Sequence, residues 1–247
     1  MSIWGKIVGG AAGLALGGAL GALIGVAGGH AVDMAVDAYR KKSGSPDTDG
    51  TKQIAFTTAV IVLGAKLAKV DGAVTRDEID AFKRVFRVPD EEMKGVAIIF
   101  NQAKKDAIGF EPYARQVGQM FAGNVAVLEE LLFCLCHIAE ADGHYNPKEQ
   151  EFLREVARHL GLDEATFRRI EAESLGPQSG DPYTILGVAR SASNEQIKSA
   201  WRKLIREHHP DTLVAQGLPQ EFIAKANETV ATINAAYEII QKERGFN

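Results

Sequence analysis

The sequence predicts an all-α protein in three parts: an apolar N-terminal helix, a larger helical domain and a short C-terminal helical hairpin. Three observations favour this fold. An uncharged segment stands near the start, a helix–turn–helix pattern occurs twice in the middle, and apolar residues near the end recur at three- and four-residue steps. With 247 residues, of which 46% are hydrophobic, the chain has room for one sizeable domain and one small domain.

The first element is the apolar segment 7–29, which carries no charged residue. A helix of this length is about 34 Å long, enough to cross a hydrocarbon layer of about 30 Å. Glycine stands at every fourth position and lines one helix face, a pattern typical of transmembrane helices that pair through close backbone contact. We expect a homodimer in the lipid through Gly9, Gly13, Gly17, Gly21 and Gly25.

Two other interpretations of this segment stand beside the dimerising helix. The first is a generic Ala/Gly-rich anchor, and the second is a cleaved signal peptide. The apolar core of a signal peptide, however, is normally about 7 to 15 residues long and follows its positive charge. Here the charges of Arg40, Lys41 and Lys42 come after the segment. By the positive-inside rule, the sequence predicts a single-pass membrane protein with its N-terminus outside and its C-terminal domains in the cytoplasm.

Connectors rich in Gly, Ser and Pro at 43–50 and 174–180 separate the parts. We therefore expect the anchor at 1–42, the larger helical domain at 51–173 and the hairpin at 181–247. The formal net charge is −4, and since nucleic-acid binding needs a basic domain, we expect no nucleic-acid partner. Cys134 and Cys136 lie two apart on a predicted helix and are expected to be buried thiols in a reducing compartment.

The larger domain contains an internal repeat, in which residues 67–78 match residues 138–149. Each copy is a helix, a tight Asp-Gly turn and a second helix, and the pattern resembles the tellurite-resistance TerB fold. That resemblance implies a possible metal site at the acidic turn residues, which are Asp71, Glu78, Asp142 and Glu149. Helix capping by the same residues explains them without a metal, so we favour structural turns and predict no metal and no cofactor.

The hairpin begins with an amphipathic helix at 194–208. Ile197, Trp201, Leu204 and His208 share one face, and Ser193 with Gln196 forms a capping-box start. Basic residues lie four apart along another face at Lys198, Arg202 and Arg206, with Lys203 beside them. Since Pro210 cannot continue the helix, the chain is predicted to turn at His209, and a second helix at 222–242 is expected to pair antiparallel with the first.

The tripeptide His209-Pro210-Asp211 between two such helices resembles the signature of the J-domain of DnaJ-type cochaperones. The order of an anchor, a TerB-like domain and a C-terminal J-domain is similar to the DjlA-type membrane-anchored cochaperones of the bacterial inner membrane. The resemblance implies a partner of the DnaK type, a heat-shock chaperone whose ATP hydrolysis a J-domain stimulates. It assigns partner binding to His209, Pro210, Asp211, Lys198, Arg202, Lys203 and Arg206.

We expect the chain itself not to be an enzyme, because it shows no nucleophile–base set and no phosphate-binding loop. An alternative function is a membrane stress or metal-sensing scaffold centred on the TerB-like domain, with the J-domain as an accessory. A third is a purely structural oligomer built by the glycine helix. ATPase stimulation assigns the first function, carboxylate-dependent binding of calcium or manganese supports the second, and strong self-association with neither leaves the third.

Overall fold

The computed structural model describes residues 7, 19–21, 48–70, 83, 89–91, 93–104, 109–140, 143, 145–176 and 180–246. Within these ranges every regular element is a helix, which confirms the predicted fold class. The larger part, here called the bundle, consists of α5 (Thr48–Leu67), α7 (Met93–Ala103), α8 (Glu111–Met120), α9 (Val125–Ala139), α10 (Pro147–Leu160) and α11 (Glu164–Ser174). The smaller part, here called the hairpin module, consists of α12 (Pro182–Ile185), α13 (Asn194–Glu207), α14 (Pro210–Ala215), the 3-10 helix η2 (Gln220–Phe222) and α15 (Ile223–Arg244).

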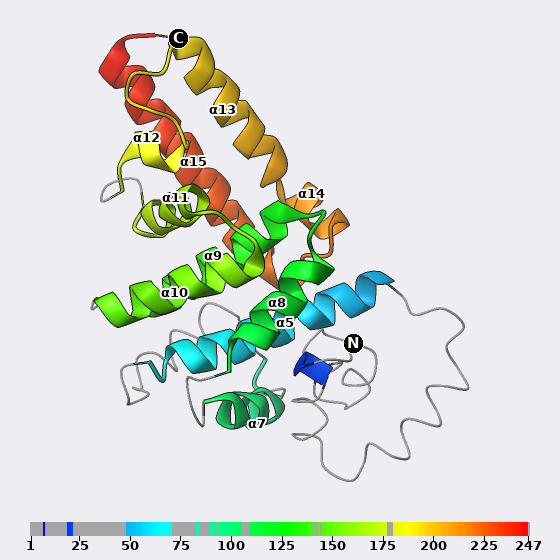
Figure 1. The fold of residues 1–247 in the computed structure, drawn as a ribbon. Coiled ribbons are helices and arrows are strands. Elements are labelled where there is room, and N and C mark those ends of the chain that lie inside the picture. Colours follow the sequence, from blue (N-terminus) through cyan, green and yellow to red (C-terminus); the bar gives the residue numbers. More distant parts are fainter. Residues whose placement is uncertain are drawn as a thin grey trace.

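Helix α5 forms the centre of the bundle and packs against α7, α8 and α9 (Figure 1). The consecutive residues 59–63 are all 0% exposed, so every side of this part of the helix is covered. A helix that is apolar all round belongs inside a core, because only burial removes its whole surface from water. Within the described part of the chain, no helix is both long and apolar enough to cross a bilayer.

The hairpin module stands on one end of the bundle, with α13 and α15 side by side along its length (Figure 1). The rings of Trp201 and Tyr237 stack with their centroids 4.5 Å apart, and Trp201 Nε1 donates a hydrogen bond of 2.8 Å to Asn234 Oδ1. Arg244 near the end of α15 donates to Tyr183 Oη at 2.9 Å and so ties α15 to α12. These contacts confirm the predicted antiparallel pair.

Helix starts follow the capping chemistry predicted from the sequence. The side chains of Asn146 and Glu149 form a reciprocal capping box at α10, and those of Ser193 and Gln196 form another at α13. Each box satisfies backbone N–H groups that the first helical turn would otherwise leave unpaired. Gly143, the glycine of the second predicted Asp-Gly turn, has the left-handed φ of +77° that such a turn needs.

The predicted dimerisation face falls largely outside the described residues, as Gly9, Gly13, Gly17 and Gly25 do. Gly21 is described, is helical and is buried. Its neighbour Leu20 donates its backbone N–H to Gln116 Oε1 of α8 at 3.0 Å.

Helices α8 and α10 cross at Gly118, where no side chain fits between the two backbones. A Cβ at Gly118 would lie 2.8 Å from the carbonyl oxygen of Leu160. We predict that Gly118→Ala lowers the free energy of unfolding by about 1–3 kcal/mol, because overpacking forces the backbones apart. Gly123→Ala is the matched control, since nothing lies within 4 Å of its added Cβ. Denaturant unfolding of the two full-length variants in detergent measures the difference, and equal stability would contradict the close crossing.

Candidate functional site

The predicted corner lies at the end of α13, where the chain turns into α14. The backbone N–H of His208 still bonds to the carbonyl oxygen of Leu204 at 2.8 Å, and His209 then becomes extended with φ −60° and ψ 130°. A residue before proline favours this extended region, and Pro210 occupies the first position of α14, where no N–H is needed. Pro210 therefore starts a helix as well as ending one, and the corner (His209, Pro210 and Asp211) is rigid.

The side chains of the corner are directed to solvent. Those of His209 and Asp211 are 54% and 96% exposed. The backbone N–H of Asp211 donates to His209 Nδ1 at 3.2 Å, so the neutral ring carries its hydrogen on Nε2. The corner thus offers an outward N–H donor beside an outward carboxylate acceptor.

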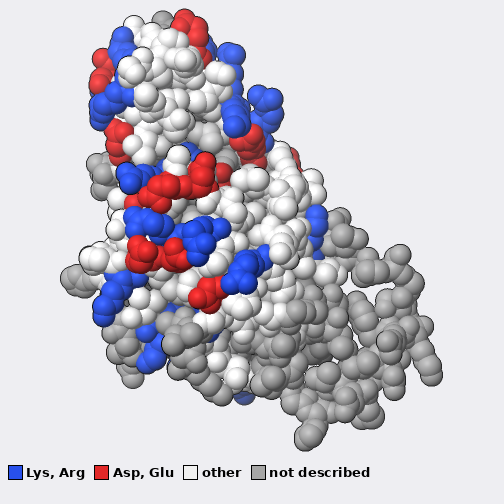
Figure 2. Space-filling model, in the orientation of Figure 1, with Lys and Arg blue, Asp and Glu red and all other residues white. Residues whose placement is uncertain are grey.

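The predicted basic face lies on the same helix as the corner. Arg202, Lys203 and Arg206 are exposed, and Lys and Arg side chains follow the α13 edge of the hairpin module (Figure 2). Lys203 pairs only distantly with Glu207, at 4.0 Å. Lys198 on the same predicted face is half-buried and interacts with neighbouring groups.

The sequence predicted the burial of His208, the residue just before the corner, but not its partners. His208 is buried, as the shared face with Ile197, Trp201 and Leu204 predicted, but its partners belong to the bundle. Its Nδ1 lies 3.0 Å from Glu130 Oε1, and its Nε2 lies 2.8 Å from Glu129 Oε2. The sequence does contain one sign of this contact: His208, a titratable residue, ends an otherwise apolar helix face, which indicates that this end of the face meets a polar partner.

A buried charge cluster surrounds this contact and is formed by Glu129, Glu130, Arg169, Glu173 and His208. Arg169 bonds Glu129 at 2.6 Å and Glu173 at 3.1 Å. Burial by itself would lower the pKa of His208, but its hydrogen bonds with Glu129 and Glu130 outweigh burial and raise that pKa to about 10. His208 is therefore protonated at neutral pH, and both ring nitrogens donate to the carboxylates.

The pKa values of Glu129 and Glu173 shift in opposite directions. Burial acts to raise the pKa of Glu129, yet hydrogen bonds and charges from His208 and Arg169 bring it down to about 2. Burial raises the pKa of Glu173 to about 7, with Arg169 only partly opposing it. Arg169 therefore offsets only part of the cost of burying the Glu173 carboxylate.

The segment just after the corner is packed into the core of the bundle. Leu213, Leu218 and Phe222 are at most 2% exposed and belong to the same apolar cluster as α5. The rings of Phe56 and Phe222 meet edge to face with centroids 4.9 Å apart. Gly217 has φ of +107°, and a Cβ there would lie 3.1 Å from Lys52, so only glycine fits at this position.

Of the four candidates for a metal site, the structure describes Glu149 alone. Asp71, Glu78 and Asp142 lie outside the described residues, and Glu149 accepts the backbone N–H of Asn146 at 3.0 Å as part of its cap. The two cysteines, Cys134 and Cys136, are free and buried as predicted. Burial raises the pKa of each thiol well above its usual value, which keeps them unreactive.

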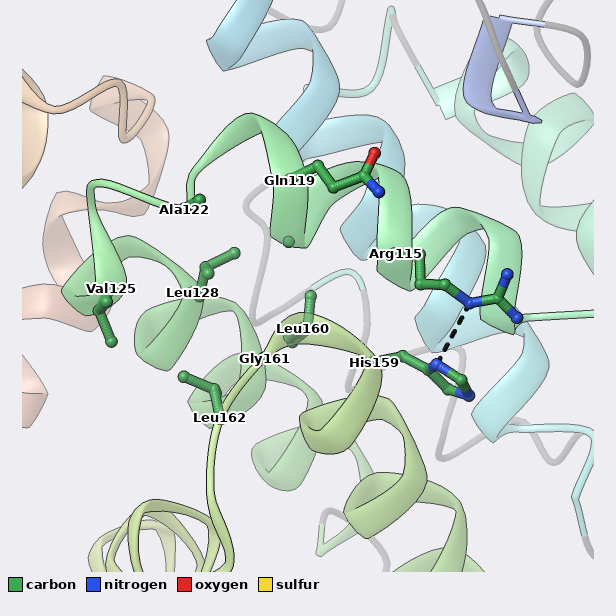
Figure 3. Close-up of a pocket in the computed structure, with 10 residues that line it drawn as sticks. Arg115, Gln119, Ala122, Val125, Leu128, His159, Leu160, Gly161 and Leu162 are labelled. Atoms are coloured by element: carbon green, nitrogen blue, oxygen red, sulfur yellow. Dashed lines mark hydrogen bonds between the residues drawn. The ribbon is translucent and has the colours of Figure 1, made fainter.

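An open groove of about 320 Å³ lies between α8, the start of α9 and the end of α10 (Figure 3). Its apolar lining includes Val125, Leu128 and Leu162, and at one end Arg115 donates to His159 Nδ1 at 3.4 Å. Burial, together with the charges of Arg158 and Arg115, lowers the pKa of His159. The polar groups at this end thus satisfy one another, and the corner remains the stronger functional site.

Comparisons with known protein families cover nearly the whole chain. The family model of the co-chaperone DjlA transmembrane domain matches residues 1–45, that of tellurite resistance protein TerB matches residues 57–172, and that of the DnaJ domain matches residues 181–245. These matches support a membrane-anchored protein and identify the bundle with a TerB domain and the hairpin module with a J-domain. No solved structure matches the chain.

Curated relatives match along their full length. The co-chaperone protein DjlA of Aliivibrio fischeri is 34% identical over all of both chains, and that of Vibrio cholerae is 33% identical over all of both chains. The protein of the same name from Photobacterium profundum is 32% identical over 99% of this chain and all of its own. With its three domain matches in the same chain and relatives of this identity over full length, the protein belongs to the DjlA family of J-domain co-chaperones.

Proposed function

We propose that this protein binds a DnaK-type heat-shock chaperone through α13 and the corner and stimulates that chaperone's ATP hydrolysis. The observation that carries the proposal is the pairing of an exposed, rigid corner with an exposed basic face on one helix. The chain supplies recognition groups, and the partner supplies the hydrolytic chemistry. The J-domain match and the full-length DjlA relatives support this role.

The basic face and the corner would have different roles, the first in attracting the partner and the second in positioning it. Arg202, Lys203 and Arg206 project from α13 and would attract an acidic chaperone surface, which raises the rate of encounter more than the affinity. Asp211 at the corner would accept charge-assisted hydrogen bonds from a partner cation, and His209 Nε2 would donate one. Since the corner is fixed by its own helix cap, these bonds form without ordering a loop.

We further propose that the chain crosses the bacterial inner membrane once, with its N-terminus in the periplasm and the TerB-like and J-domains in the cytoplasm. The charge bias of Arg40, Lys41 and Lys42 supports this orientation. The glycine repeat supports a homodimer in the lipid. Both proposals rest on the sequence pattern of the anchor and on its match to the DjlA transmembrane domain.

We predict that His209→Gln removes the stimulation of ATP hydrolysis and changes the free energy of unfolding by less than about 1 kcal/mol, because the side chain lies outside the core. Single-turnover hydrolysis by a DnaK-type chaperone, with the full chain in lipid nanodiscs, measures the first quantity. Glu207→Gln, also exposed at the end of α13, is the control and should stimulate like the parent. Full stimulation by His209→Gln would overturn the proposed function.

We predict that Arg202→Glu combined with Arg206→Glu slows association with the chaperone and removes much of the salt dependence of its rate. The control is Arg158→Glu combined with Arg168→Glu, which makes the same change of net charge on the bundle, where these arginines form exposed ion pairs of small energetic value. Stopped-flow association over a range of salt concentrations measures both. An equal response of the two double variants would mean that net charge, rather than the α13 face, governs association.

We predict that Gly17→Leu combined with Gly21→Leu leaves the chain in the membrane but makes it monomeric. Leucine raises the hydrophobicity of the segment while it fills the surface on which two backbones would meet. Gly10→Leu combined with Gly18→Leu is the control on another face of the same helix. Crosslinking in membranes measures self-association, and loss of the dimer in the control alone would show that the other face pairs.

A further inference from the structure

The TerB-like domain contacts the J-domain at the residue adjacent to the corner. His208 is 1% exposed, while the side chain of its neighbour His209 is 54% exposed, so the chain passes from the domain interface to the docking surface within one residue. Glu129 and Glu130 bind the two ring nitrogens of His208, at 2.8 Å and 3.0 Å. Bonds to both nitrogens of one ring fix its rotation and its position together.

We propose that Glu129 and Glu130 of the TerB-like domain are positioning residues for the J-domain, and that through His208 they hold the corner in the orientation that the chaperone partner reads. This role rests on the proposed function and goes beyond it, because it gives the TerB-like domain a part in stimulation. Neither glutamate would touch the chaperone. Both residues act through His208, and Glu130 also accepts a hydrogen bond from Thr229.

The contact is strong enough to hold the corner because it is charged and dry. With its pKa raised to about 10, His208 is a buried cation at neutral pH, and removal of a carboxylate leaves that cation short of a partner. Thr229 Oγ1 of α15 donates to Glu130 Oε2 at 3.2 Å and holds this carboxylate from the other side. Glu130 therefore links the ends of α13 and α15 to α9.

The other flank of the corner is held by the same domain. Leu213 and Phe222 are buried in the TerB-like core, and Asn124 Nδ2 donates to the carbonyl oxygen of Gln216 at 3.1 Å. The corner is thus fixed immediately before and shortly after its three residues. The side chains of His209 and Asp211 stay exposed, so the TerB-like domain orients the corner without covering these two groups.

If Glu129 and Glu130 had a purely structural role, their substitution would change stability alone. Substitution of Glu173 distinguishes this structural role from the positioning role. Glu173 belongs to the same buried cluster, but its hydrogen-bond partner is Arg169 on its own helix rather than His208. Glu173→Gln therefore perturbs the buried charges and leaves the bonds to His208 in place. Glu130→Ala removes an acceptor of His208, and Glu130→Gln keeps an oxygen acceptor without the charge.

The test measures single-turnover ATP hydrolysis by a DnaK-type chaperone at rising concentrations of the full chain in lipid nanodiscs. We predict that Glu130→Ala lowers the maximal stimulated rate by about tenfold, since a misplaced corner would no longer hold the partner's catalytic groups in register, and misplacement by about 1 Å is enough for such a loss. The half-saturating concentration should change by less than about twofold, because the basic face that binds the partner is intact. Glu130→Gln should recover part of the rate, and Glu173→Gln should match the parent.

Hydrogen exchange provides a readout that does not depend on the partner. Amides of the last turn of α13 and of α14 should exchange faster in Glu130→Ala than in the parent, and at the parent rate in Glu173→Gln. If Glu130→Ala does not fold, Thr229→Val and Glu130→Gln take its place as two separate variants. Thr229→Val removes the hydrogen bond to the same carboxylate, and each variant should still lower the maximal rate.

The outcomes separate this role from the proposed function. A parent chain that fails to stimulate hydrolysis overturns both. A parent that stimulates, with Glu130 variants that keep the parental maximal rate, overturns the positioning role alone. A rise in half-saturating concentration at an unchanged maximal rate overturns it too, because the glutamates would then act on partner binding.

Discussion

The arrangement of the molecule depends on one buried cation, His208, held between two carboxylates of α9. Without these partners a protonated ring at this depth would cost far more than any apolar contact nearby returns, so the two domains have to meet here in one register. The apolar contacts of Phe222 with Phe56 add area to the same interface. Area alone would allow the domains to slide, and the charge contact selects one of the possible positions.

The corner illustrates how a short motif acquires its properties from its surroundings. Pro210 fixes one backbone angle, and the caps of α13 and α14 fix the helices on either side. The neighbouring side chains alternate sharply between burial at His208 and exposure at His209. The corner is stiff because both helices that reach it are attached to a much larger core.

Much of this architecture was predictable from the sequence, because the signals were local. The capping boxes at Asn146 and Ser193 and the apolar face that includes Trp201 each follow from spacing within one helix. The partners of His208 were not predictable in this way, since Glu129 lies 79 residues away in sequence. Lys198 likewise matched the basic stripe by spacing, and only the packed structure shows that it is half-buried and engaged.

The contact of Gly217 with Lys52 has a consequence for where the protein can work. Lys52 lies in the second turn of α5, the first described helix of the bundle after the segment that matches the transmembrane domain. The rise along α5 from its first residue to Lys52 is only about 6 Å, so the loop after the corner lies beside the start of the bundle. In an anchored chain the proposed docking site would therefore lie beside the start of α5, the end of the bundle that follows the anchor in sequence. A partner bound at the corner would approach that same end of the bundle.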